Sequence, residues 1–171
     1  MQQVTSGSKR FPAALASGFL AQDVHGHPAR VAYDNGYIYD LFNPRAREYA
    51  FDGVRSGYID PYGLRFWWLD CDEPCGGDMS KLVYNNGTWP AAFVGAAYPH
   101  MVDRMVWEGM RNVSGGGDDD GEGIVMLGRS AWAGSQRFGG AVWSGDTSST
   151  FRDLNQQFRA GLNMVSCDEL W

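Results

Sequence analysis

The chain has 171 residues, of which 44% are hydrophobic and 14% aromatic, so it suits one ordinary domain or part of a larger one and is too apolar for a disordered protein. Its formal net charge of −6 argues against a nucleic-acid-binding protein, because phosphate groups require a basic surface. No continuous apolar run approaches the roughly 20 residues of a transmembrane helix, so a membrane span is not expected.

The first half of the chain predicts a helix, a strand and a second helix. Asn43 is a suitable N-cap and Pro44 a suitable first residue for a helix that extends to about residue 54. The apolar run LRFWWL at 64–69 predicts a buried strand. Residues 98–112 predict a helix whose apolar side chains recur at helical spacing. Its buried face should consist of Met101, Val102, Met105 and Val106.

The last third predicts two more short strands and a third helix. Apolar runs at 123–128 (GIVMLG) and 140–143 (GAVW) predict the strands, and Thr150 and Asp153 have the spacing of a capping box at the start of a helix. The inward face of that helix should consist of Phe151, Leu154, Phe158 and Leu162. Because short apolar strands alternate with amphipathic helices, the sequence predicts an α/β fold with a parallel sheet.

Two segments resemble metal sites only superficially. The acidic run SGGGDDDGEG at 114–123 lacks the alternating ligand positions of a calcium loop, so we expect a solvated connector there. Cys71 and Cys75 form a lone C-x3-C pair, which is weak evidence for zinc without a second pair. The three cysteines are too few for a disulfide framework, so we expect free thiols, and their number leaves the cellular compartment open.

Charged residues follow all three predicted strands. Asp70 follows the first strand, Arg129 follows the second, and Asp146 comes shortly after the third. Parallel strands end at one edge of a sheet, and in barrels of parallel strands that edge carries the catalytic groups. The alternative is that each strand simply reaches solvent at this point. Three strands in succession favour a functional site over that alternative.

Tryptophans accompany these charged residues. Aromatic faces provide apolar surface for the C–H groups of a pyranose, and carboxylates can act as acid, base or nucleophile on an acetal. The tryptophans concerned are Trp67, Trp68, Trp132 and Trp143. Core packing is the alternative for each of them, and Trp67 and Trp68 cannot point to the same side of one strand. The combination suggests a sugar site.

Several motifs resemble those of glycoside hydrolase family 31. WLDCDEP at 68–74 is similar to that family's nucleophile motif, W-[IL]-D-x-[ND]-E. Residues 128–164 resemble its second signature, in which R-S-x-x-A-G-S-Q-R is followed by W-x-G-D and by a helix ending in G-L-N. The resemblance covers about 19–164, and residues 165–171 diverge from it. The whole chain, 1–171, is therefore expected to form an incomplete catalytic barrel domain.

The resemblance implies a retaining α-glycosidase built on a (β/α)8 TIM barrel. Asp70 occupies the position of the nucleophile and Asp146 that of the general acid/base. Residues at substrate-contacting or supporting positions are Arg129, Trp68, Trp143 and Glu73. The substrate would be an oligosaccharide or another α-glycoside, hydrolysed without any metal or organic cofactor. Both α-glucosidase and α-xylosidase activities fit the motifs.

The chain resembles a central slice of such a barrel. Only three or four of the eight expected strands can be counted, and the family's later H-D-I-G-G-type segment is absent. We therefore expect little hydrolysis from this chain without the missing remainder of the barrel. The competing interpretation is a catalytically inactive, carbohydrate-binding remnant of an enzyme. Intact residues at Asp70, Asp146 and Arg129 favour descent from a working enzyme.

Overall fold

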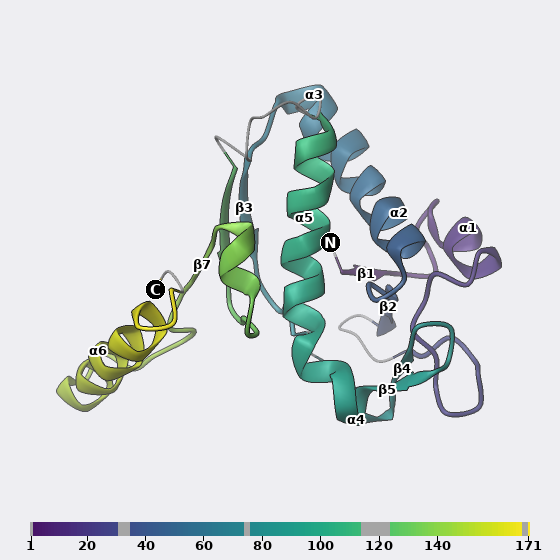
Figure 1. Cartoon of the computed structure of the whole chain (residues 1–171). Helices are drawn as coiled ribbons and strands as arrows, with labels where there is room; N and C mark the ends of the chain where they lie inside the picture. The colour runs from purple at the N-terminus through teal and green to yellow at the C-terminus, as the bar shows by residue number, and fades with distance from the viewer. Residues whose placement is uncertain (1, 31–34, 74–75, 114–123, 169–170) are drawn as a thin grey trace.

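The computed structural model describes residues 2–30, 35–73, 76–113, 124–168 and 171 (Figure 1). The connector predicted at 114–123 and Cys75 of the C-x3-C pair lie outside these residues. Within the described part of the chain, no helix combines the length and the apolar character needed to cross a membrane.

Helices and strands alternate along most of the chain. The helices are α1 (Phe11–Ala16), α2 (Pro44–Val54), α3 (Asp60–Tyr62), α4 (Ala91–Val94), α5 (Tyr98–Val113) and α6 (Phe151–Val165). The strands are β1 (Gln3–Val4), β2 (Tyr37–Ile38), β3 (Phe66–Leu69), β4 (Val83–Tyr84), β5 (Trp89–Pro90), β6 (Val125–Gly128) and β7 (Gly140–Val142). A π-helical segment (Arg55–Ile59) and 3₁₀ turns (Met79–Lys81, Gly95–Ala97 and Ser135–Phe138) complete these elements.

The three strands predicted from the sequence form one parallel sheet in the order β3–β6–β7. The long helix α5 lies between β3 and β6 in the chain and packs on one face of this sheet (Figure 1). Trp67, Leu69 and Met126 are buried on that face. The predicted α/β architecture, a parallel sheet covered by a helix, is therefore confirmed.

The opposite face of the sheet is exposed, which corrects the prediction of a fully buried strand. Phe66 and Trp68 are 73% and 67% exposed, although both belong to the apolar run that indicated burial. The exposed apolar side chains of this face are Phe66, Trp68, Val125 and Leu127. Side chains alternate between the two faces of a strand, and within the described residues only the face toward α5 is covered. An apolar run predicts a strand that can be buried on both sides, but it does not supply the second covering layer.

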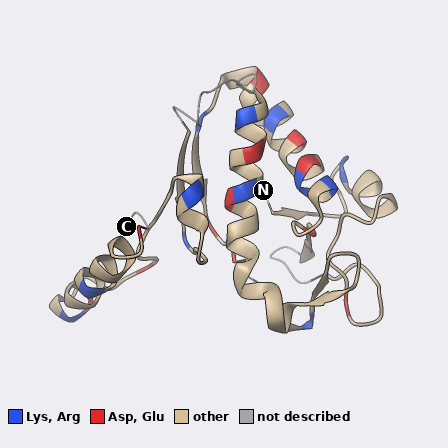
Figure 2. Cartoon of the chain, viewed as in Figure 1, with Lys and Arg blue, Asp and Glu red and all other residues tan. Residues whose placement is uncertain are grey.

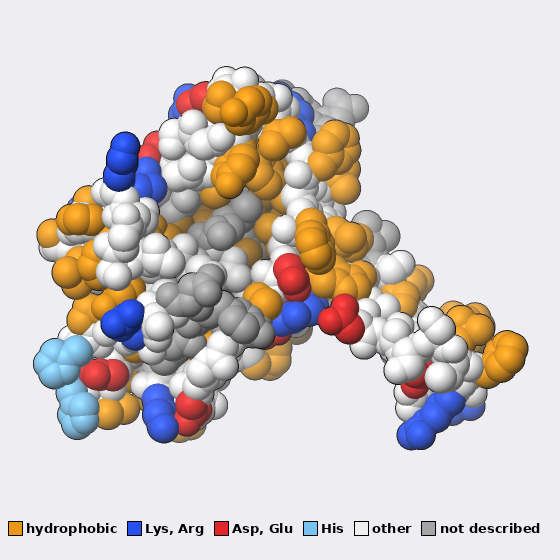
Figure 3. Space-filling model, turned by 180° about the vertical axis from the view of Figure 1, so that it is seen from behind, with side chains coloured by type: hydrophobic (Ala, Val, Ile, Leu, Met, Phe, Trp, Pro, Cys, Tyr) orange, Lys and Arg blue, Asp and Glu red, His pale blue; other side chains and the backbone are white. Residues whose placement is uncertain are grey.

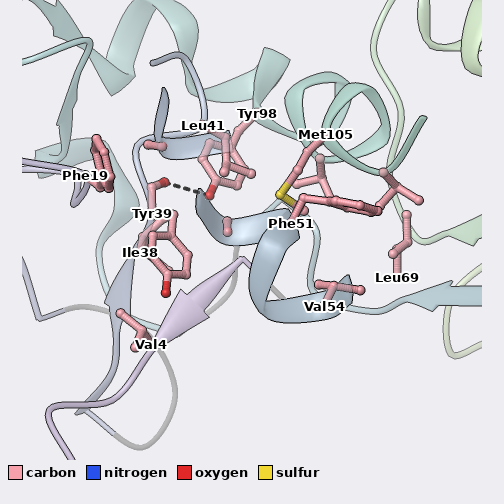
Figure 4. Packing of buried hydrophobic residues seen from close by; sticks show 14 of the residues in the cluster. Val4, Phe19, Ile38, Tyr39, Leu41, Phe51, Val54, Leu69, Tyr98 and Met105 are labelled. Carbon is pink, nitrogen blue, oxygen red and sulfur yellow. Dashed lines mark hydrogen bonds between the residues drawn. The ribbon is translucent and has the colours of Figure 1, made fainter. Parts of the chain in front are cut away.

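The core lies mainly between α2, α5 and the short pair β1–β2 (Figure 4). The predicted cap of α2 is confirmed, because the Asn43 side chain accepts a hydrogen bond from the backbone N–H of Arg45 at 3.0 Å. On α5, Val102, Met105 and Val106 are buried as predicted, whereas Met101 is only partly buried.

Charges of both signs are interspersed along α2 and α5 (Figure 2). Arg47 of α2 is buried and donates hydrogen bonds to the Leu41 carbonyl at 2.8 Å and to Glu108 of α5 at 3.3 Å. Glu108 also accepts from Arg104 one turn earlier, at 2.6 Å. Because a buried cation requires partners, this network fixes the packing of α2 on α5.

Two antiparallel pairs, β1–β2 and β4–β5, were not predicted. Their strands are two residues long, which is too short for an alternating pattern to be recognised. The turn between β4 and β5 places Asn85, Asn86 and Gly87 in the left-handed region, with φ values of 52°, 54° and 82°. Asparagine and glycine tolerate this conformation best, so the NNG sequence is suited to the turn.

The predicted inward face of α6 is wrong. The helix itself forms, and the Thr150 hydroxyl accepts from the backbone N–H of Asp153 at 3.1 Å, as the capping box predicts. Its apolar side chains are 58–91% exposed, namely Phe151, Leu154, Phe158 and Leu162. Figure 1 shows α6 projecting from the rest of the chain, and Figure 3 shows apolar side chains on this projection. An amphipathic pattern specifies an apolar face, but the partner must come from elsewhere, and the described residues do not provide one.

Candidate active site

The carboxyl ends of β3, β6 and β7 lie side by side. Leu69, Gly128 and Val142 are register partners across the three strands. The backbone N–H of Arg129 donates to the Leu69 carbonyl at 3.3 Å, and that of Trp143 donates to the Gly128 carbonyl at 3.1 Å. The shared edge that the sequence predicted is therefore present.

Arg129 joins two carboxylates at this edge. Its Nη1 lies 3.2 Å from Oδ1 of Asp70, the residue directly after β3. Its Nη2 and Nε donate to the two carboxylate oxygens of Glu73, the second at 3.4 Å. Both Asp70 and Arg129 are partly exposed, and such an ion pair contributes only about 0–1 kcal/mol to stability. Its main consequence is that it orients the Asp70 carboxylate.

The electrostatics of this group keep Arg129 and Glu73 charged. Burial would raise the pKa of Glu73, but the hydrogen bonds from Arg129 outweigh it, so the pKa is lowered. The hydrogen bond to Glu73 raises the pKa of Arg129 in turn. A carboxylate and a guanidinium held in this way can present a fixed positive charge to Asp70 and to sugar hydroxyl groups.

Two tryptophans meet on the exposed face of the sheet. The rings of Trp68 on β3 and Trp143 after β7 have centroids 5.6 Å apart and planes inclined at 52°. Trp67 points to the opposite, buried face, as strand alternation requires. Trp132 is half exposed. Figure 3 shows charged side chains of both signs beside apolar ones near the base of the projecting α6.

Asp146 does not join the group formed by Asp70, Arg129 and Glu73. It is exposed, four residues after the last residue of β7 and directly after Gly145, which has a φ of 71°. None of the described residues forms a hydrogen bond or an ion pair with its side chain. The structure thus connects three of the predicted site residues directly, pairs two tryptophans, and leaves Asp146 on a neighbouring loop.

Cys71 differs from the expectation of free thiols. It is disulfide-bonded, whereas Cys167 is free and exposed. Cys71 has a left-handed backbone, with a φ of 54°, and its Sγ accepts from Nη2 of Arg129 at 3.3 Å. A count of cysteines cannot show which thiols are close in space, so this bond was missed. Among the described residues, no group of three or more His, Cys, Asp or Glu side chains is arranged to hold a metal ion.

Sequence reasoning also missed two residues that support the loop after β3. The Gln2 side chain donates to the backbone carbonyls of Asp70 and Cys71 at 3.2 and 2.6 Å, which ties the start of the chain to the site. Asp72 is fully buried, and its Oδ2 accepts from the backbone N–H of Ser130 at 3.4 Å. No pattern marked Gln2, and Asp72 stands in an acidic run that the sequence alone leaves open to solvent.

Comparison with known proteins identifies the family. A family model described as the glycosyl hydrolases family 31 TIM-barrel domain matches residues 1–168. The chain belongs to glycoside hydrolase family 31. The family match is longer than the stretch 19–164 that the motifs indicated. It agrees with the parallel sheet and with the partial (β/α)8 barrel expected from the sequence.

The family 31 relatives include both glucosidases and xylosidases by name. An uncharacterised family 31 glucosidase of Pseudescherichia vulneris is 36% identical over 165 residues, which are 94% of this chain and 29% of the relative. Alpha-xylosidase A of Aspergillus niger is 29% identical over 188 residues, covering 98% of this chain and 25% of that protein.

A solved structure gives the same relation. The family 31 α-xylosidase from a soil metagenome, in complex with xylose, is 33% identical with a TM-score of 0.81, and the match covers 97% of this chain and 24% of that one. The chain thus spans about a quarter of the length of these relatives and corresponds to part of their family 31 barrel.

Proposed function

We propose that this chain carries the nucleophile and the general acid/base of a retaining α-glycosidase, with Asp70 in the first role and Asp146 in the second. The observation that carries the proposal is the Asp70–Arg129 ion pair at the carboxyl edge of a family 31 sheet. An exposed carboxylate that is oriented by a cation, at the end of a sheet that also carries a pair of tryptophans, suits attack on a sugar. Asp146 is placed on the loop after the next strand but one, β7.

The reaction would proceed in two displacements. Asp70 attacks the anomeric carbon to form a covalent glycosyl-enzyme, while protonated Asp146 gives its proton to the departing glycosidic oxygen. Asp146 then takes a proton from water, which attacks the anomeric carbon and releases the sugar with its configuration retained. This requires the two carboxyl groups to come within about 5–5.5 Å of each other in the complete site.

The supporting residues have distinct roles in this proposal. Glu73 fixes the Arg129 guanidinium, and Arg129 then orients Asp70 and donates to sugar hydroxyl groups. Trp68 and Trp143 provide the apolar surface on which a pyranose ring stacks. No step of this scheme requires a metal or an organic cofactor.

The proposed substrates are α-xylosides or α-glucosides, in keeping with the names of the relatives. We infer that the chain has little activity without the rest of a barrel, because its sheet is apolar and exposed on one face and the apolar side chains of α6 are exposed. The second candidate is a sugar-binding remnant without turnover. It is favoured by the pairing of the exposed Trp68 with the partly buried Trp143, which needs no opposing barrel wall to contact a sugar.

The test is a barrel in which residues 1–168 replace the matching segment of the soil-metagenome α-xylosidase. Asp70→Asn in this chimera should lower the hydrolysis of a nitrophenyl α-xyloside by at least about a thousandfold, since it removes the nucleophile. Asp60→Asn is the matched control, because Asp60 is also an exposed aspartate paired with an arginine, Arg55, at 3.2 Å.

Three outcomes separate the candidates. Loss of turnover with Asp70→Asn but not with Asp60→Asn supports the enzyme. Equal activity of the two variants refutes the role of Asp70. A folded chimera that binds xylose, measured by tryptophan fluorescence, but does not hydrolyse the xyloside supports the binding remnant.

A further inference from the structure

The side chain of Asp72 is fully buried two residues after the proposed nucleophile. Its Oδ2 accepts a hydrogen bond from the backbone N–H of Ser130 at 3.4 Å. The same oxygen lies against Gly128, the last residue of β6. A Cβ atom added to Gly128 would lie 2.9 Å from this Oδ2, so glycine leaves the room that the carboxyl group occupies. Oδ1 of Asp72 accepts no hydrogen bond from an N–H or O–H group of the described residues. A buried carboxyl group with one unsatisfied oxygen is costly, and most costly when it is ionised.

Three charged groups face Asp72. Glu73 follows it in the same loop, Asp103 of α5 also lies near Gly128, and Arg129 is held by Asp70 and Glu73. Asp103 is itself buried, and its Oδ1 would lie 4.0 Å from a Cβ on Gly128. Burial raises the pKa of Asp72 to about 8, and the carboxylates of Glu73 and Asp103 act in the same direction.

We propose that Asp72 is a positioning residue that works in its protonated form, joining the loop after β3 to the loop after β6 so that Arg129 stays on Asp70. The uncharged carboxyl group accepts the Ser130 N–H and shares its proton with Glu73. Glu73 in turn accepts from Arg129 and, at 3.3 Å, from the Ser130 hydroxyl. An ionised Asp72 would repel Glu73 and compete with it for Arg129.

This inference rests on the proposed function only for its effect on catalysis. The position of the proton has a consequence for folding that needs no turnover. In the unfolded chain Asp72 would lose its proton near the ordinary value of 3.8, whereas the folded chain keeps it to about pH 8. Between these values the folded state binds the extra proton. The contribution of the Asp72 proton to stability is complete below the unfolded-state pKa of 3.8. It is lost as the pH rises through the folded-state pKa of about 8.

The first experiment compares urea unfolding of the 171-residue chain at pH values from about 5 to about 8.5, and repeats it in the chimeric barrel. Stability should fall with rising pH in the parent protein and fall much less in Asp72→Asn, because asparagine mimics the protonated acid and does not titrate. Asp60→Asn, an exposed control, should keep the parent's pH dependence. An Asp72→Asn protein whose stability falls with pH as steeply as that of the parent overturns the inference.

The second experiment measures kcat/KM in the chimera against pH. Asp72→Asn should keep activity within about threefold at pH 6 and extend it to higher pH, whereas Asp72→Ala, which leaves the Ser130 N–H and Glu73 without their partner, should lose at least about tenfold. Equal losses in the two variants contradict the role of a protonated Asp72. If the chimera without these substitutions has no turnover, the proposed function fails, and the unfolding experiment still decides the state of Asp72.

Discussion

Replacing Gly109 with alanine should destabilise the chain, because Gly109 is where α5 passes closest to α2. A Cβ atom built on Gly109 overlaps the ring of Phe51. Phe51 is buried in the core beside Met105 and cannot leave without exposing its ring (Figure 4). The two helices would have to separate, or the ring would have to adopt an unfavourable rotamer.

Two opposing effects determine the size of this change. Alanine is favoured over glycine in a helix by about 1 kcal/mol. Adding a methyl group to a well-packed core costs about 1–3 kcal/mol. Gly57 provides the matched control, because it is also helical and exposed and a Cβ atom there would have no neighbour within 4 Å. Gly57→Ala should therefore be neutral or stabilising. The free energy of unfolding of Gly109→Ala should be about 1–3 kcal/mol lower than that of Gly57→Ala.

Urea unfolding followed by circular dichroism at 222 nm measures the free energy of unfolding of both variants. A crystal structure of Gly109→Ala would show the Phe51 ring displaced. Combining Gly109→Ala with Phe51→Leu should recover part of the loss, since the smaller side chain gives the methyl group room, and the double-mutant cycle should show coupling of at least about 0.5 kcal/mol. If Gly109→Ala is as stable as Gly57→Ala, the inference that α5 packs closely on α2 at Gly109 is refuted.

Two further predictions concern hydrogen bonds. The buried Tyr98 hydroxyl donates to the Tyr39 carbonyl at 2.8 Å, so Tyr98→Phe should lower the free energy of unfolding by about 1–2 kcal/mol, measured by urea unfolding, and an unchanged value would contradict this bond. Thr150→Ala removes the N-cap of α6 and should destabilise that helix by about 1 kcal/mol. Because α6 projects from the core, hydrogen exchange should speed up in its first turn while the main unfolding midpoint stays unchanged; a shift of that midpoint would show that α6 packs on the core.

The features that the sequence predicted well depend on neighbouring residues. Asn43 caps α2 and Thr150 caps α6, because each cap is a contact between residues two or three positions apart. The shared edge of β3, β6 and β7 was predictable for a similar reason, since parallel strands with a helical crossover place their carboxyl ends together. Asp70 and Arg129 meet there as a direct result.

The features that the sequence did not predict depend on what covers a surface. The apolar face of α6 and the Phe66 side chain are exposed because no layer covers them in the described structure. A periodic pattern in the sequence cannot reveal whether such a layer exists. The burial of Asp72 depends on its approach to Ser130, 58 positions later in the chain. Two further acids, Asp70 and Glu73, stand close to Asp72 in the sequence, a feature more typical of a solvated loop.

The one-sided covering of the β3–β6–β7 sheet has a practical consequence for the purified chain. Aromatic and aliphatic side chains that meet water on one molecule can meet the same side chains on another, so the colloidal behaviour of the preparation should depend on its concentration. Dilute refolding, or a mild detergent that occupies this surface, should then yield more monodisperse material than a concentrated sample in plain buffer.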